Sequence, residues 1–454
     1  MDSSSYEKKP TKKNLYYRKR AFGMSSLDRT EVKEKSKFIK DVQKLMLFAA
    51  DDSGSDMEEL FEDLCDLQDS LCEEIRELEE VDPRIHDPLP PVHRKYRTIE
   101  SFDDTDIRQY FRFETKDQLH RLVTGFRFPE ELRSGVGNKF SGEEILLCGI
   151  YRLHSVNALG DAGWQAIFGM VQSVATMACN LFFEYMWKWW SYLLFDHVRF
   201  WVDRIPAMAE AIRLKLEQLD CYFPPGTFRV FGFIDNTMNA TCRPGGGPAQ
   251  DGIRAPRNDP EIQRAWYNGW KKLHGLKWQT IDLPNGMNFK VDGPFSCRDN
   301  DLTTLNISDV LVLLEALLNV YGLQGYRIYG DSAYVVINDG PLLARHQGDA
   351  LSPREVLENR TMSSCRETIE WDYGDIGRYF KLLDYKHVLQ IRKMPVAKMC
   401  ISAFILRNAL VTMNGCNTSE YYTCIPPSFE EWVGEGPRQF NPEWCNQEVD
   451  VNGV

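Results

Sequence analysis

The alternation of apolar and polar positions divides the chain into a helical part and a part in which strands alternate with helices. Between about residues 100 and 220, apolar side chains recur at intervals of three and four. Two of these runs begin at predicted capping boxes, Thr115-Lys-Asp-Gln118 and Ser141-Gly-Glu-Glu144. Residues 227–235 instead alternate and then run apolar, which predicts a strand buried inside a sheet. The pattern therefore predicts a helical region followed by an α/β region.

The α/β region continues with a hairpin, a helix and another strand. The hairpin strands are expected at residues 276–283 and 287–291, joined by Pro284-Asn-Gly286, a typical hairpin turn. A helix over residues 308–321 then leads into a short β-prone run, residues 326–330. Strand, hairpin, helix, strand and a later helix is the order of an α/β fold in which helices flank a mixed sheet.

Two long apolar runs are expected to be buried helices. Residues 181–201 are the most hydrophobic stretch, but four charged side chains interrupt them, which favours a buried helix over a membrane span. Residues 396–413 are expected to form an apolar helix that closes the α/β region. We therefore expect no membrane association.

The composition of the chain indicates its cellular compartment and limits how it can bind DNA. The chain has 454 residues, enough for two or three domains, and 12 cysteines without a Cys-x-x-Cys pair. We therefore expect free thiols in a reducing compartment, the nucleus or the cytoplasm. A net charge of −12 does not suit a protein that coats DNA indiscriminately, because phosphate contacts need Lys and Arg.

The first hundred residues carry two blocks of opposite charge. Basic residues cluster between positions 8 and 20, and three interpretations stay open: a nuclear import signal, a DNA-binding arm and a solvated disordered tail. Residues 51–82 are acidic, yet their leucines keep a helical spacing. This spacing predicts an amphipathic helix that docks on its own domain or on a partner.

A helix-turn-helix is one interpretation of residues 164–177, a shape compatible with binding in the major groove of DNA. The other interpretation is a plain helical bundle that packs on the α/β region. The second helix is not basic, which favours the bundle.

Three acidic residues lie at the ends of two predicted strands and on a predicted helix. Asp235 ends the first strand and Asp331 follows the short β-prone run, and either one alone is most simply a turn former or a helix cap. Glu370 lies on a predicted helix, on one face with Arg366 and Tyr373. Two strand-end aspartates and one helical glutamate can converge on a pair of divalent cations.

Three motifs around these residues carry a resemblance to a known family. They read Asp235-Asn-Thr, Gly330-Asp331-Ser-Ala-Tyr334, and Asn359-Arg followed by Ser363-Ser-Cys-Arg366, Glu370 and Tyr373-Gly374. Over about residues 110–425 the chain resembles the DDE transposase superfamily and, within it, the PIF/Harbinger transposases and the nucleases derived from them. The resemblance implies that Asp235, Asp331 and Glu370 are the catalytic triad and hold two Mg²⁺ or Mn²⁺ ions. Rival third ligands lie on the same helix, and both register and motif favour Glu370 over Glu367, Asp372 and Asp375.

The resemblance also implies a set of DNA contacts. Residues 267–279 and 293–299 are similar to the family's basic/histidine motif and to the Gly-Ser-Asp turn that follows it. The residues assigned to DNA binding, near the scissile strand, are Lys271, Lys272, His274, Lys277, Arg298 and Arg366. The alternatives are a solvated basic turn for the lysines and a structural ion pair for Arg366. Asp299 and Asp301 are expected to cap the next helix or to support the site from outside it.

The chain is thus expected to have four parts. Residues 1–100 form a partly disordered region with the amphipathic helix, 101–222 a helical domain, 223–425 an RNase H-like DDE nuclease domain, and 426–454 a tail.

The expected function is that of a metal-dependent DNA endonuclease or transposase, with strand transfer if the protein transposes. The expected partners are DNA, a Myb-like DNA-binding protein and a second copy of the chain. The expected location is the nucleus, or the cytoplasm when the protein is not imported. One alternative is a domesticated, non-catalytic module that binds DNA or protein. Another is an unrelated metal-dependent phosphohydrolase, which does not predict a helical third ligand.

Overall fold

The computed structural model describes Ser70 and residues 98–437, apart from 136, 156–157, 159, 245–259, 338–339 and 392. Met1–His93 and Arg94–Val454 form two separate units. The basic cluster of residues 8–20 lies outside the described residues. So does the amphipathic helix expected over 51–82, except for Ser70, which is helical.

The first part of the described chain is helical, as the pattern predicted, with one two-stranded ladder. Thr115 and Ser141 are N-caps, because their hydroxyls accept hydrogen bonds from the backbone N–H groups of Gln118 and Glu144. The elements are η1 (Ile99–Ser101), α4 (Asp104–Phe111), α5 (Lys116–Gly125), β1 (Leu132–Arg133), β2 (Lys139–Phe140), α6 (Gly142–His154), α7 (Asp161–Phe168), α8 (Gln172–Trp190), α9 (Tyr192–Phe195), α10 (Val198–Trp201), η3 (Val202–Arg204) and α11 (Ile205–Gln218).

The pair α7 and α8 has the helix-turn-helix connection considered from the sequence. Gly169 has a φ of 62° and ends α7, and the two helices are bent by 74°. However, α8 is largely buried, and Lys188 in its last turn is its only basic residue. These features favour packing rather than insertion into a groove. The burial predicted for residues 181–201 is confirmed.

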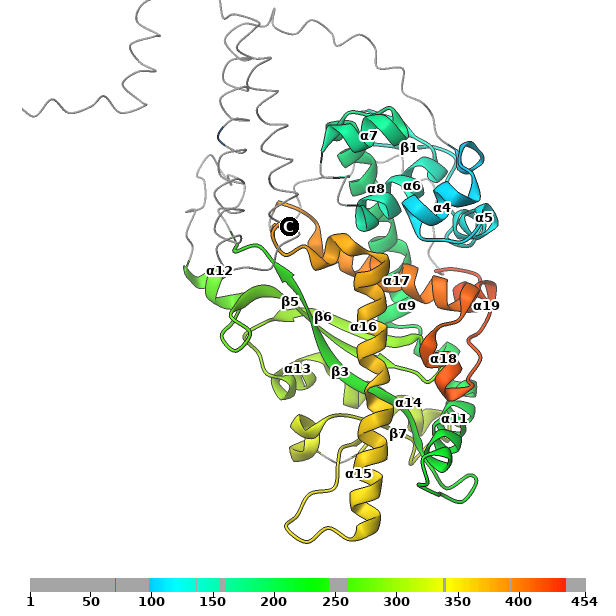
Figure 1. The fold of residues 1–454 in the computed structure, drawn as a ribbon, viewed down its shortest axis with the longest axis vertical. Helices are drawn as coiled ribbons and strands as arrows, with labels where there is room; N and C mark the ends of the chain where they lie inside the picture. The colour runs from blue at the N-terminus through cyan, green and yellow to red at the C-terminus, as the bar shows by residue number, and fades with distance from the viewer. Residues whose placement is uncertain are drawn as a thin grey trace, which may run out of the picture. The chain divides into compact units, whose positions relative to one another are not determined.

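The second part contains a mixed sheet with strand order β6–β5–β3–β7–β8, and β4 pairs with the start of β5. β3 pairs antiparallel with β5 and parallel with β7, β5 pairs antiparallel with β6, and β7 pairs parallel with β8. The bounds are β3 (Val230–Thr241), β4 (Tyr267–Asn268), β5 (Leu273–Asp282), β6 (Asn288–Ser296), β7 (Arg327–Tyr329) and β8 (Leu342–Leu343). This topology is consistent with an RNase H-like domain (Figure 1).

The hairpin predicted around Pro284-Asn-Gly286 is confirmed as the connection from β5 to β6. The Leu283 N–H donates to the Met287 carbonyl at 3.0 Å, and Gly286 has a φ of 79°. A Cβ at Gly286 would also meet the Cys416 Sγ atom at 2.1 Å, so this turn requires glycine for conformation and for space.

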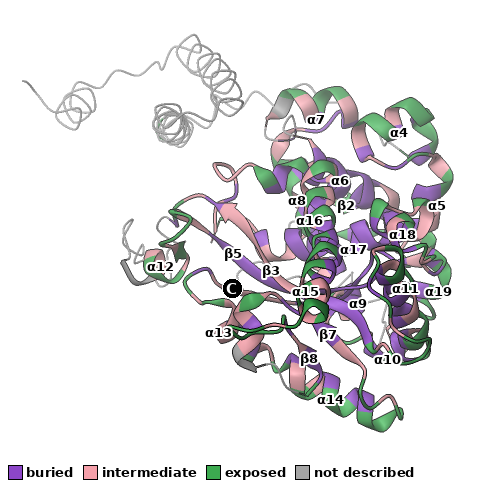
Figure 2. Ribbon diagram, turned by 60° about the horizontal axis from the view of Figure 1, so that its bottom comes forward, coloured by how far each residue is buried: buried purple, intermediate pink, exposed green. Residues whose placement is uncertain are grey.

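Helices flank the sheet. The long helix of residues 353–379 consists of α15 and α16 and crosses the sheet in front of β3 in Figure 1, while α12 lies beside one end of β5 (Figures 1 and 2). The bounds are α12 (Pro260–Ala265), α13 (Asp301–Ser308), α14 (Val310–Val320), η4 (Ser332–Ile337), α15 (Pro353–Arg366), α16 (Thr368–Tyr379), η5 (Lys381–Asp384), α17 (Val396–Asn414), α18 (Asn417–Tyr422) and α19 (Phe429–Val433). The helices predicted over residues 308–321 and 396–413 are confirmed as α14 and α17.

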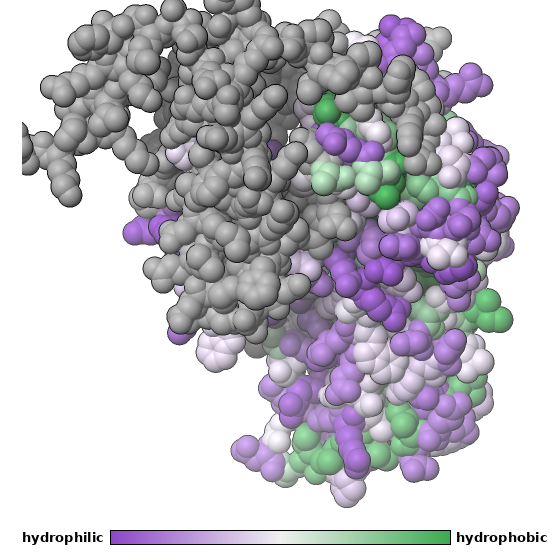
Figure 3. Space-filling model, turned by 45° about the horizontal axis from the view of Figure 1, so that its top comes forward, coloured by the Kyte–Doolittle hydropathy of each residue, from purple (hydrophilic) through white to green (hydrophobic). Residues whose placement is uncertain are grey.

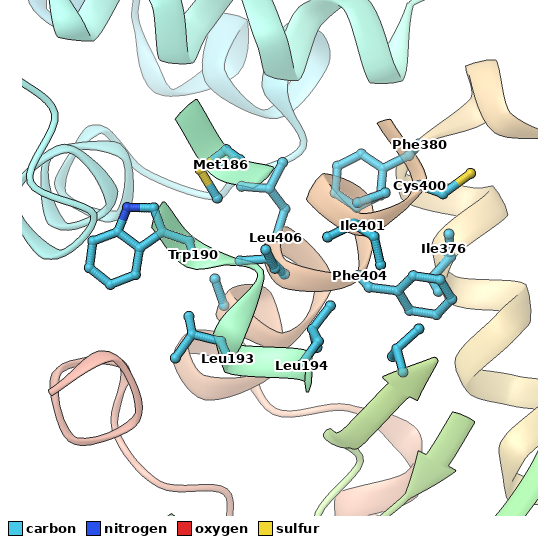
Figure 4. Close-up of a cluster of buried hydrophobic side chains, with 14 of the residues drawn as sticks. Met186, Trp190, Leu193, Leu194, Ile376, Phe380, Cys400, Ile401, Phe404 and Leu406 are labelled. Carbon is cyan, nitrogen blue, oxygen red and sulfur yellow. The ribbon is translucent and has the colours of Figure 1, made fainter. Parts of the chain in front are cut away.

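One hydrophobic core joins the helical part to the sheet. Figure 4 shows Trp190 of α8, Leu193 and Leu194 of α9, and Ile401, Phe404 and Leu406 of α17 in one cluster of buried hydrophobic side chains. By length and composition α17 could cross a membrane, as could the bent pairs α7–α8 and α13–α14, but 78% of the apolar window in α17 is buried inside the protein. Hydrophilic side chains cover much of the described surface on the face shown in Figure 3.

Candidate active site

Strands β3 and β7 bring Asp235 and Asp331 to neighbouring positions. Phe233 and Tyr329 are parallel partners, and each aspartate follows its partner residue by two positions. The charge of Asp331 accordingly acts on the carboxyl group of Asp235. The two aspartates therefore lie where the pairing between β3 and β7 stops.

The expectation that Asp235 ends its strand was wrong. β3 continues to Thr241, because β5 pairs with it as far as Thr241 opposite His274. Asp235 is instead the point at which β3 loses one of its two neighbours. Beyond the pairing with β7, β3 remains paired with β5 on its other side.

Asp235 is held by an ion pair and a backbone hydrogen bond. The Arg366 Nη1 atom lies 2.5 Å from Asp235 Oδ2, and the Asn236 N–H donates to Asp235 Oδ1 at 2.8 Å. Burial raises the pKa of Asp235 to about 6, while the charge of Arg366 and the Asn236 hydrogen bond lower it and the charges of Asp331 and Asp301 raise it. The Asp235 carboxyl group is therefore harder to ionise than that of an ordinary aspartate, although Arg366 partly offsets the effect of burial.

Asp331 sits in the turn after β7. Its Oδ1 atom accepts the Ala333 N–H at 2.8 Å. A Cβ at Gly330 would lie 2.5 Å from the ring of Tyr334, so the glycine before Asp331 leaves room for that ring. Tyr334 is buried, and its hydroxyl accepts a hydrogen bond from Asn236 Nδ2 at 3.0 Å. The second motif therefore packs directly against the first.

Asp301 is a further carboxylate beside this pair. Its Oδ1 atom accepts from Asn236 Nδ2 at 2.9 Å and lies 2.8 Å from Lys277 Nζ. The expectation that Asp299 or Asp301 caps the next helix was wrong, because Asn300 caps α13 through the Thr303 N–H. Asp301 follows that cap and reaches the site instead.

Glu370 lies in the first turn of α16 and is exposed. Arg366 and Tyr373 share its face: Arg366 binds Asp235, and the Tyr373 hydroxyl is 2.7 Å from Thr280 Oγ1, on the residue opposite Asp235. In the part of the chain that the structure describes, no group of three or more His, Cys, Asp or Glu residues could hold a metal ion. The structure thus brings together two of the three predicted ligands.

The rival acids on α16 have other partners. Asp372 is buried with Arg407, whose Nη2 atom lies 2.5 Å from Asp372 Oδ1 and 3.6 Å from Asp375 Oδ2. Thr418 donates a further hydrogen bond to Asp372 at 2.9 Å. These contacts make Asp372 and Asp375 parts of a buried ion-pair network behind the helix.

The predicted DNA contacts fall into two groups. Lys277 is buried against Asp301, and Arg366 is paired with Asp235, so both belong to the site. Lys271, Lys272 and Arg298 are exposed, and His274 is half-buried and lies opposite Tyr267. Lys272 precedes Thr280 by eight residues, which at about 3.3 Å per strand residue is roughly 25 Å along β5. The exposed lysines therefore lie far from the aspartates.

A surface hollow of about 480 Å³ is lined by Trp371, Asn417, Glu420 and Tyr421. It contains none of the three predicted catalytic carboxylates. The aspartate pair therefore lies outside this hollow.

The mixed sheet has one aspartate in β3 and another just after β7, the parallel neighbour of β3, and a helix packs across it. This arrangement is consistent with a nuclease domain of the RNase H-like class. Residues 250–408 match a protein family described as DDE superfamily endonuclease. The match covers about a third of the chain; it includes Asp331, Arg366 and Glu370 and begins after Asp235. No curated protein and no solved structure matched the chain. The family match supports a transposase-type nuclease that acts on DNA.

Proposed function

We propose that the protein is a DNA endonuclease of the PIF/Harbinger type that uses Asp235, Asp331 and Glu370 as its catalytic carboxylates. The observation that carries the proposal is that Asp235 of β3 and Asp331 after β7 each lie two residues beyond the last paired residues of these parallel strands, Phe233 and Tyr329. The family match over residues 250–408, which includes two of the three residues, supports it.

The described residues fit a divalent cation in part. Asp235 and Asp331 supply two carboxylates, the oxygen donors that Mg²⁺ and Mn²⁺ prefer, and the burial of Asp235 next to another acid creates a demand for positive charge. They would hold the metal, with Glu370 as the third ligand. Bound metal would supply Lewis-acid stabilisation of the charge that develops on a phosphodiester.

The side chains around the pair have positioning roles. Arg366 holds the Asp235 carboxylate in one orientation, and the hydrogen bond between Tyr373 and Thr280 fixes α16 against β5. Water attacks the phosphorus, a new P–O bond forms, the bond to the 3′ oxygen breaks, and that oxygen takes up a proton. The product 3′-hydroxyl is the nucleophile for strand transfer if the protein transposes.

A second candidate is a domesticated module that binds DNA or protein without cutting. The observation that favours it is the exposure of Glu370, together with the pairing of Asp235 with Arg366. In this case the sheet and its helices are retained as a scaffold, and the carboxylates have no catalytic role.

Cleavage of supercoiled plasmid and of transposon-end DNA in Mg²⁺ or Mn²⁺ separates the two candidates. Wild type is expected to nick DNA, and Asp235→Asn, Asp331→Asn and Glu370→Gln are each expected to reduce cleavage at least 100-fold. Glu367→Gln is the matched control, because Glu367 is an exposed acid on the same helical segment. Inert wild-type protein in both metals, with a candidate partner supplied, would favour the binding module.

We further propose a nuclear location and a Myb-like DNA-binding partner that docks on residues 51–82. Deletion of these residues should abolish co-purification of the partner. Unchanged co-purification and unchanged nuclear DNA association would exclude this docking site.

A further inference from the structure

The side chain of Trp270 is 93% exposed, in the turn between β4 and β5. Trp371, the other exposed tryptophan in the described part of the chain, is 41% exposed and packs edge-on against Tyr421. A single exposed apolar side chain needs no explanation by itself. Trp270 differs because its backbone is held in place and because cationic side chains flank it.

Asn268 orders the turn that carries Trp270. Its Oδ1 atom accepts the backbone N–H groups of Trp270 at 3.0 Å and Lys271 at 2.8 Å. Its Nδ2 group donates to the Cys297 carbonyl at 2.8 Å, which ties the turn to the chain just after β6. Lys272 completes the turn with a φ of 53°. The indole is therefore held in solvent by a defined turn, since three hydrogen bonds fix Asn268.

Cationic side chains surround this corner of the sheet. Lys271, Lys272 and Arg298 are exposed, and Arg298 directly follows Cys297, to which the turn is bonded. The charges of Lys271 and Lys277 both act on the Cys297 thiol, as does the opposing charge of Asp299. The whole chain carries a net charge of −12, so this group of cations runs against the overall charge. An aromatic side chain directly followed by two lysines suits a polyanion that also presents flat bases.

We propose that residues 269–272 form a DNA contact in which the indole of Trp270 stacks on an unstacked base while Lys271 and Lys272 bind the adjacent phosphates. This inference rests on the proposed function, because it takes DNA to be the substrate that reaches Asp235 and Asp331.

The position of the turn sets where on the DNA this contact falls. The turn lies roughly 25 Å along β5 from the residue opposite Asp235, and successive base pairs are about 3.4 Å apart. For DNA that lies along β5, the proposed contact of Trp270 would fall about seven base pairs from the scissile phosphate. A contact at that distance takes no part in bond cleavage and acts on binding and register.

The test measures DNA binding by the full chain in EDTA, where no metal-dependent cleavage occurs. Fluorescence anisotropy gives the Kd for a labelled duplex, a duplex with one unpaired base and a single strand, each at several salt concentrations. The variants are Trp270→Ala, Trp270→Phe and the double variant Lys271→Ala with Lys272→Ala. Tyr222→Ala is the control, because Tyr222 is an aromatic side chain that is 56% exposed on the connection from α11 to β3.

Trp270→Ala is expected to raise the Kd about tenfold for the duplex with an unpaired base, in line with one lost stacking contact, and Trp270→Phe to recover most of this loss. The salt dependence should stay unchanged in Trp270→Ala. In the double lysine variant the slope of log K against log salt should fall by about 2, since each phosphate contact contributes about 0.9. Tyr222→Ala should bind as wild type.

A Kd for Trp270→Ala within twofold of the control would overturn the inference, as would a tenfold loss that Trp270→Phe does not recover. The single strand could instead bind more tightly than either duplex and depend on Trp270 to the same extent. The DNA that Trp270 contacts would then be a single-stranded end rather than a duplex. If wild type cuts DNA and Trp270→Ala binds DNA as tightly as wild type, the endonuclease proposal stands and the proposed Trp270 contact is wrong. If DNA binding depends on Trp270 but wild type does not cut DNA, the Trp270 contact stands and the endonuclease proposal is wrong.

Discussion

Asp282 lies next to the ion-pair network of Asp372, Asp375 and Arg407, and its protonation makes the stability of the protein depend on pH. It is buried, accepts a hydrogen bond from Thr280 at 2.9 Å and another from Asn288, and feels the charge of Asp372. Burial first, and then the charge of Asp372, raises the pKa of Asp282 above that of an ordinary aspartate, although Asn288, Thr280 and Arg407 oppose the shift. Asp282 therefore keeps its proton to a higher pH in the folded protein than in the unfolded chain.

Because the pKa of Asp282 is higher in the folded protein than in the unfolded chain, its protonated form stabilises the fold at low pH. This stabilisation is lost as pH rises from the unfolded-state pKa, about 4, through the folded-state pKa. Asp282→Asn mimics the protonated acid and should lose less stability on this rise. We expect the difference in unfolding free energy between the variant and wild type to shift in favour of the variant by at least about 1.4 kcal/mol between pH 5 and pH 8, the equivalent of one pKa unit.

Urea denaturation of both proteins at the two pH values measures this difference. Asp349→Asn is the control, because Asp349 is exposed. An equal difference at both pH values would show that Asp282 is ionised throughout this range.

Two acids of helix α16 are only two residues apart in sequence but lie on different faces of the helix. Glu370 is exposed, and Asp372 is buried against Arg407. We expect Glu370→Ala to change the unfolding free energy by less than about 0.5 kcal/mol while abolishing cleavage. Asp372→Ala should cost about 3 kcal/mol or more, because it removes the carboxylate that lies 2.5 Å from the buried Arg407 and leaves Asp375 at 3.6 Å.

Guanidinium denaturation and the plasmid assay, run on the same samples, measure both effects. If Glu370→Ala unfolds the protein or Asp372→Ala leaves its stability unchanged, the division of α16 into a site face and a core face is wrong.

Elements that depend on local sequence could be predicted, and those that depend on distant partners could not. The turn at Gly286 and the caps at Thr115 and Ser141 carry their own signals and are present. The extension of β3 beyond Asp235 had no signal, because residues 236–241 are mostly polar or small and become a strand through pairing with β5. Capping by Asn300 rather than its acidic neighbours was a choice among adjacent residues that all suit a cap.

The site itself was predictable in part for the same reason. The motifs singled out Asp235 and Asp331, and the register of β3 with β7 places them side by side. The position of Asp301 depends on Lys277 and Asn236, which lie on two other elements, so no local pattern indicates it. The exposure of Trp270 also escaped the sequence analysis, although a tryptophan between Gly269 and two lysines is a usable signal for a surface turn.

At the scale of the whole chain, the shared core couples the helical part to the sheet. Lys290 of β6 donates to the Phe195 carbonyl of α9 at 3.0 Å, and Trp201 of α10 packs near Phe289. We therefore expect Leu194→Ala, a cavity in α9, to lower stability by about 2–5 kcal/mol and to weaken the sheet as much as the helices.

Hydrogen exchange measured by mass spectrometry tests this coupling on peptides from α6 and from β5. Both should lose the same opening free energy in Leu194→Ala. A loss confined to α6 would show that residues 101–222 are an independent domain, as the sequence suggested.

The register that joins Asp235 to Asp331 has a consequence for the protein during its synthesis. The two residues are almost a hundred positions apart, and they become neighbours only when β7 adds to β3. A nascent chain that has emerged as far as β6 has its first aspartate but not its second, and a chain with misplaced β7 has both but keeps them apart. If the proposed endonuclease is correct, only chains in which β7 has paired with β3 would cut DNA, and nicking would then report correct folding.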